Sequence, residues 1–115
     1  MTARKQALSD LLALVESGEA TGKIGPIMIN YWHVETEVHA LSAYTRSLDS
    51  ARYLQNAMLP GWTRAVDASA PECGITVELF APGQQPDQTV KGNDAVESRA
   101  WLIAILKALI AGEDA

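Results

Sequence analysis

The chain has 115 residues, of which 48% are hydrophobic and 20% are charged, and its net charge is −5. This length and composition fit one globular domain covering residues 1–115 and exclude a disordered chain. The acidic balance disfavours direct binding to nucleic acid or to anionic membranes. An N-terminus without a long apolar core argues against a signal peptide and predicts a cytoplasmic protein.

The first predicted element is a helix over residues 3–18, followed by glycines that favour a helix end. Its apolar residues recur with the spacing of one helical face: Leu8, Leu11, Leu12 and Val15. Residues 23–46 are harder to interpret, because Pro26 interrupts any regular helix and the apolar run 27–32 fits a strand or a short buried helix. We expect an extended or irregular connection there.

A second helix is predicted over residues 48–59. Ser47 is a suitable N-cap that accepts from the amide of Ser50, and Pro60 with Gly61 ends the helix. The hydrophobic period then changes from helical to two, which predicts strands over 61–67 and 75–80, joined as a hairpin through the turn-rich segment 68–74. Ile75, Val77 and Leu79 are expected on the buried face of the second strand.

Residues 81–93 are rich in Pro, Gly and Gln and are expected to form a loop. The last predicted helix covers 94–111 and begins with Asp94 and Glu97 at capping-box spacing. Between Ala100 and Ala111 the helix is apolar nearly all round, which is typical of a helix between layers or at a subunit interface. Four of its side chains are not expected all to pack within one chain, which predicts a homodimer through residues 100–111. These four are Leu102, Ile103, Leu106 and Ile110.

The segment 43–66 resembles small uncharacterised phage and prophage proteins of proteobacteria, loosely related to the phage ABA sandwich domains. The resemblance lies in a helix start and a Leu-Pro-Gly-Trp helix stop, carried by Tyr44, Thr45, Ser47, Leu48, Asp49, Ala51, Leu59, Pro60, Gly61 and Trp62. It extends to the apolar helix 94–111. This chain departs from the pattern at Ser50, where alanine is common, and in the loop 81–93, which lacks a threonine-proline entry. The resemblance implies a phage origin and a fold, but no activity, substrate or cofactor.

Two groups of residues raise the question of catalysis. His33, Glu35, Glu37 and His39 are metal-ligand types, but alternating positions on one strand face span roughly 20 Å, too far for all four to reach one ion. Cys73 stands beside Glu72, which disfavours the thiolate form that a nucleophile requires. A small metal-dependent or thiol enzyme is therefore the least favoured alternative, and we expect a non-enzymatic protein without metal or cofactor.

The residues without a predicted packing role point to a binding surface. An aromatic patch with an acidic rim is expected if the segment 23–42 lies beside the hairpin, and it comprises Tyr31, Trp32, Glu35, Glu37, Glu78 and Phe80. Aromatic residues serve as binding anchors, and carboxylates steer a basic partner toward them. The alternative for Tyr31 and Trp32 is a place in the core beneath the first helix.

Together these patterns predict an α+β fold in which a small antiparallel sheet is packed between helices, as in an α-β-α sandwich. The function predicted first is a phage or prophage accessory protein that binds a host or phage protein. One form of it would inhibit a host defence complex with a basic nucleic-acid channel, as anti-CRISPR proteins do. The alternative is a structural, self-assembling phage protein that forms a homodimer.

Overall fold

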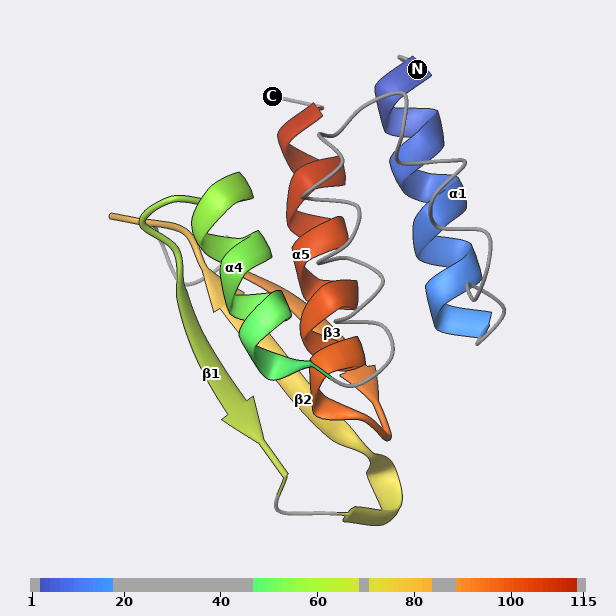
Figure 1. The fold of residues 1–115 in the computed structure, drawn as a ribbon, viewed down its shortest axis with the longest axis vertical. Helices are drawn as coiled ribbons and strands as arrows, with labels where there is room; N and C mark the ends of the chain where they lie inside the picture. Colours follow the sequence, from blue (N-terminus) through green and yellow to red (C-terminus); the bar gives the residue numbers. More distant parts are fainter. Residues whose placement is uncertain (1–2, 18–46, 69–70, 84–88, 114–115) are drawn as a thin grey trace.

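The computed structural model describes residues 3–17, 47–68, 71–83 and 89–113, which form helices and one antiparallel sheet (Figure 1). The α+β class predicted from the sequence is confirmed. The elements in chain order are α1 (Ala3–Ser17), α4 (Leu48–Met58), β1 (Thr63–Asp67), the short 3-10 helix η1 (Pro71–Cys73), β2 (Ile75–Phe80), β3 (Thr89–Asp94) and α5 (Glu97–Glu113).

The sheet has the strand order β1-β2-β3, and both pairs of neighbours are antiparallel. The predicted hairpin of β1 and β2 is confirmed, with Val66 directly opposite Val77. The predicted alternation in β2 is confirmed at Val77 and Leu79, which are fully buried. Ile75, at the start of the strand, is only half-buried, as are the residues of the other face. In β1, by contrast, all five residues are exposed.

The expectation of a loop over 81–93 is wrong at its end, because residues 89–94 form the strand β3. β3 completes its hydrogen-bond ladder on β2, and Val90 packs against the core. Gly92 is buried where α5 crosses, and a Cβ atom there would overlap the carbonyl oxygen of Ala100. The sequence suggests that Gly92 belongs to a loop, but in the structure it allows the backbones of β3 and α5 to approach closely.

The start of α4 agrees with the sequence. Ser47 has an extended backbone, and its hydroxyl oxygen accepts a hydrogen bond from the amide of Ser50 at 3.0 Å. The helix ends at Met58, and Gly61 takes a φ of 87° in the turn toward β1. Such a positive φ favours glycine in this turn. Pro60, which has no amide hydrogen to donate, prevents the helix from continuing.

The start of α5 differs from the predicted capping box. Asp94 is the last residue of β3, and its Oδ1 accepts from the amide of Val96 at 2.9 Å and lies 3.8 Å from Nη1 of Arg99. The amide of Ala100 donates to the carbonyl of Val96, so the helix begins at Glu97. Asp94 therefore forms a local turn before the helix. The Glu97 side chain does not complete a capping box, because it pairs with Arg64 of β1.

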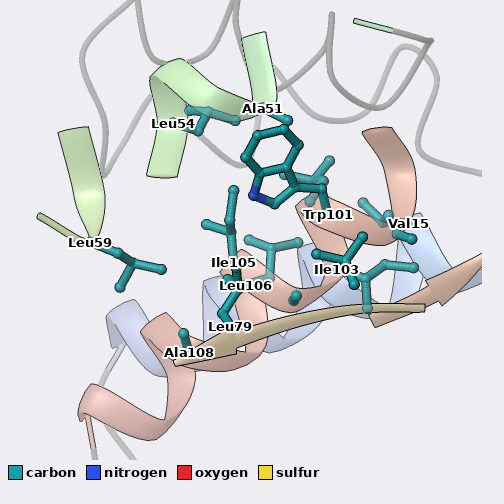
Figure 2. Close-up of a cluster of buried hydrophobic side chains, with 14 of the residues drawn as sticks. Val15, Ala51, Leu54, Leu59, Leu79, Trp101, Ile103, Ile105, Leu106 and Ala108 are labelled. Carbon is teal, nitrogen blue, oxygen red and sulfur yellow. The ribbon is translucent and has the colours of Figure 1, made fainter. Parts of the chain in front are cut away.

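The core is built around α5, which packs on β2 and β3 and is also contacted by α1 and α4 (Figures 1 and 2). In the described part of the chain, α5 rather than the sheet is the middle element. α1 contributes Leu8, Leu11 and Val15 to this core, and α4 contributes Ala51 and Leu54. This arrangement explains why the apolar residues of α5 occupy all sides of the helix.

The expectation that Leu102, Ile103, Leu106 and Ile110 cannot all pack within one chain is wrong. The first three are at most 1% exposed in the single chain, and Ile110 is half-buried against the core. The homodimer through residues 100–111 therefore loses the reasoning that suggested it. No helix within the described ranges is long and apolar enough to cross a membrane.

Gly92→Ala tests the close approach of β3 and α5. The added methyl group would overlap the oxygen of Ala100 and lie 2.7 Å from the backbone nitrogen of Ala104, so the strand and helix must move apart. We expect urea unfolding to show a loss of about 3 kcal/mol in the free energy of unfolding. Gly112→Ala is the control, because no atom lies within 4 Å of its Cβ. The free energy of unfolding of Gly112→Ala should stay within about 1 kcal/mol of the wild-type value, or rise because alanine has a higher helix propensity than glycine. Equal effects of the two variants would contradict the close approach.

Candidate functional site

The sheet has a second face, here called the outer sheet face, which points away from Val77, Leu79 and α5. Residues directly opposite each other in an antiparallel ladder share a face. The register places Glu78 between Ala65 and Lys91. The complete outer sheet face consists of Thr63, Ala65 and Asp67 on β1, Thr76, Glu78 and Phe80 on β2, and Thr89, Lys91 and Asn93 on β3.

A hollow of about 130 Å³ lies on this face. It is lined by Ala65, Asp67, Thr76, Glu78 and Lys91 of the outer sheet face, and also by Val66, which lies opposite Val77 and so belongs to the other face of β1. Pockets that enclose drug-sized ligands have volumes of roughly 300–1,000 Å³, so this hollow is far smaller than such a pocket.

The charges around the hollow favour a basic group. Asp67 and Glu78 contribute two carboxylates, and Lys91 contributes one ammonium group. Asn93 orders the neighbouring row, because its Nδ2 donates to the hydroxyl of Thr76 at 3.0 Å and to the carbonyl of Cys73 at 3.1 Å. The amide thereby ties η1 to β3 and supports the wall of the hollow.

The structure brings together two of the six residues predicted for a binding patch. Glu78 and Phe80 lie two positions apart on β2, and both are half-buried on the outer sheet face. Tyr31, Trp32, Glu35 and Glu37 lie outside the described residues. The patch as a whole therefore stays a prediction.

Sequence reasoning missed Lys91, because it assigned residues 81–93 to a loop. The available signal was short: Thr89, Val90 and Lys91 alternate between polar and apolar types, and Gly92 then interrupts the pattern. Three alternating residues after a Pro- and Gln-rich segment are weak support for a strand. Only pairing with β2 places Lys91 directly opposite Glu78.

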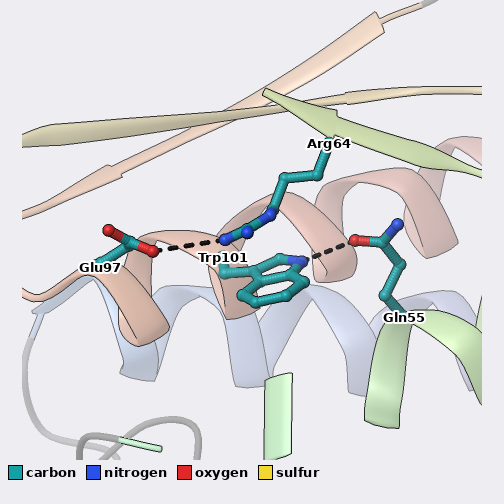
Figure 3. Close-up of polar contacts among 4 residues, drawn as sticks. All are labelled: Gln55, Arg64, Glu97 and Trp101. Atoms are coloured by element: carbon teal, nitrogen blue, oxygen red, sulfur yellow. Dashed lines mark hydrogen bonds and ion pairs between the residues drawn. The ribbon is translucent and has the colours of Figure 1, made fainter. Parts of the chain in front are cut away.

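A polar cluster on the inner side of β1 links the sheet to two helices (Figure 3). The guanidinium of Arg64 lies 3.9 Å from the centroid of the Trp101 ring, and its Nη1 lies 3.3 Å from Oε2 of Glu97. The Arg64 and Glu97 side chains are 29% and 31% exposed, so solvent screens the ion pair and its contribution is at most about 1 kcal/mol. Stacking on the indole adds a comparable amount.

The other edge of the Trp101 ring is fixed by Gln55 from α4. The indole Nε1 donates to Oε1 of Gln55 at 2.7 Å, and Nε2 of Gln55 donates to the carbonyl of Trp62 at 3.0 Å. Gln55 is 6% exposed and Trp101 is 4% exposed, so both hydrogen bonds satisfy groups that water barely reaches. This cluster positions β1 against α4 and α5.

Of the two groups considered for catalysis, only Cys73 lies among the described residues. His33, Glu35, Glu37 and His39 lie outside the described residues, and the described residues contain no group of three or more His, Cys, Asp or Glu side chains that could hold a metal. Cys73 is exposed on η1. Comparisons with protein-family models, curated proteins and solved structures found no match. The resemblance to phage proteins stays a prediction.

Gln55→Leu tests the Trp101 cluster. The change leaves the indole N–H and the carbonyl of Trp62 without their partner, while keeping an apolar side chain of similar size. We expect a loss of roughly 2 kcal/mol in the free energy of unfolding. Asn56→Leu, at the exposed neighbouring position, should change stability by less than about 0.5 kcal/mol. Indistinguishable unfolding curves for the two variants would contradict a structural role for the Gln55 bridge.

Proposed function

We propose that this chain is a non-enzymatic protein that acts by binding another protein through its outer sheet face. The observation that supports this most is the hollow between Ala65, Glu78 and Lys91, which is open to solvent and smaller than a pocket for a drug-sized ligand. β2 and β3, which carry Thr76, Glu78 and Lys91 at the hollow, are held on their other face by α5. A rigid surface of this kind loses little conformational entropy when a partner docks.

The chemistry of the surface favours a basic partner. The chain carries a net charge of −5, and two of the three charged side chains at the hollow are carboxylates. Such a surface attracts a positively charged partner over a Debye length and selects against acidic ones. Phe80 lies on the same face of β2 as Glu78 and offers an aromatic anchor beside the charged group.

The resemblance to phage and prophage proteins supplies the biological form of this proposal. The chain would act in the host cytoplasm as an accessory protein, and the partner would be a host or phage protein. A host defence complex with a basic nucleic-acid channel fits the acidic surface, which would occupy the channel in place of nucleic acid. In that form the protein is an inhibitor of the anti-CRISPR kind.

The binding proposal is tested with the tagged chain as bait in lysate of a phage-infected bacterial host, followed by titration of the recovered partner. Glu78→Lys reverses a charge at the hollow, and Glu72→Lys makes the same change on η1, outside the hollow. We expect Glu78→Lys to raise Kd by at least about tenfold, or 1.4 kcal/mol, and Glu72→Lys to change it by less than about threefold. Both variants must keep the wild-type melting temperature.

Equal weakening by the two variants would show a general charge effect and would contradict binding at the hollow. Capture of no partner above the level of an unrelated acidic bait would contradict the proposal as a whole. If the partner is a defence complex with a basic channel, nucleic acid should compete with the wild-type chain for it.

A further inference from the structure

β1 forms an open edge of the sheet. Among the described strands it pairs with β2 alone, and all five of its residues are exposed. Figure 1 shows β1 at the outer margin of the described elements, with no described strand beyond it. Half of the backbone N–H and C=O groups of such a strand point outward, where they can pair with another strand.

The other edge of the sheet is better protected. α5 packs along β3, and Nζ of Lys107 donates to the carbonyl oxygen of Lys91 at 2.9 Å. α5 packs on the face of the sheet, and the lysine that it carries partners one backbone acceptor of β3. A lysine at an edge strand is a common device against pairing with another chain. The two edges of this sheet therefore differ in their readiness to accept a further strand.

β1 carries little of the usual protection. The segment Thr63–Asp67 contains no proline or glycine, and the guanidinium of Arg64 is held over Trp101 and beside Glu97 rather than across the edge. The centre of the strand presents Ala65 and Val66, and Val66 is one of the most exposed large hydrophobic residues described, at 39%.

We propose that β1 pairs antiparallel with β1 of a second copy of this chain, about a two-fold axis at Ala65. All five residues of β1 take part only when the axis passes through this central residue. Thr63 then faces Asp67 of the second copy, Arg64 faces Val66, and Ala65 faces Ala65. This register places no like charges opposite each other, and the stem of Arg64 covers the exposed Val66. A register without opposed like charges is compatible with a two-fold interface.

The pairing would create a continuous sheet of six strands with the described helices on one side. Because the two-fold axis is perpendicular to the sheet, both outer sheet faces lie on the same side. The two Glu78 side chains would be separated by three strand spacings, about 14 Å. The inference does not rest on the proposed partner, but the dimer would present two hollows to one partner.

The dimer should be weak and salt-dependent. Five paired residues bury less surface than the roughly 1,200–2,000 Å² of a stable interface. Two chains that each carry a charge of −5 also repel each other, and salt screens this repulsion. We therefore expect association to strengthen as the salt concentration rises.

Sedimentation velocity between about 10 µM and about 1 mM tests self-association. The expected mass rises with concentration from one chain of 12.4 kDa toward two. Val66→Lys places a charge on the edge and should abolish the rise. Leu48→Lys is the matched control, because Leu48 is 43% exposed on α4, and it should leave the rise unchanged. A single-chain mass throughout, or equal behaviour of the two variants, would overturn the proposal.

A cysteine crosslink tests the register independently. In a Cys73→Ser background, Ala65→Cys places two thiols opposite each other at the axis, where mild oxidation should give a covalent dimer. Asn56→Cys, exposed on α4, should not crosslink above the background. If another segment of the same chain occupied the edge, the protein would be monomeric and the outward amides of β1 would be protected from hydrogen exchange. That result would also overturn the proposal.

Discussion

The close approach of β3 and α5 at Gly92 is the constraint on which the rest of the fold depends. A strand and a helix can touch through their backbones only where one of them has no side chain. Here the missing Cβ faces Ala100 and Ala104, two further small residues of the helix. With α5 set this close to the sheet, its remaining sides must be covered by other elements, and α1 and α4 provide that cover.

The position of β1 depends on a second, polar interaction. Trp101 receives Arg64 on its ring face and Gln55 at its indole nitrogen, so one buried side chain connects β1, α4 and α5. The same interaction determines what β1 presents to solvent, because it withdraws the strand's cationic group from the edge. Trp101 thus contributes to the stability of the fold and also holds the Arg64 side chain away from the open edge of β1. A change at Trp101 would alter both.

The elements that could be predicted from the sequence are those with a local signal. α1 and α4 follow from the spacing of their leucines and alanines, the Ser47 cap follows from residue type, and β2 follows from its strict alternation. Glu78 and Phe80 were correctly placed on the face opposite Val77 and Leu79 for the same reason. Each of these signals needs only a few neighbouring residues.

β3 and the packing of α5 could not be predicted in this way. Gly92 reads as a loop residue until the helix that crosses it is known, and Lys91 joins the hollow only through pairing with β2. Asp94 and Glu97 have capping-box spacing, yet Arg64 is the partner that receives Glu97. The apolar surface of α5 suggested a second chain, because the spacing of residues within a helix does not reveal how many other elements pack around it. In the structure β2, β3, α1 and α4 all contact α5.

The hydrogen bond from Lys107 to the carbonyl of Lys91 has a consequence for the size of any assembly. A sheet with two open edges can add copies without end and grow into a fibre. A sheet with one blocked edge has a single growing side, and a second copy that pairs there consumes the open edge of both molecules. If β1 pairs with a second copy as proposed, Lys107 occupies a backbone acceptor of the strand at the far edge and disfavours the addition of a further copy there.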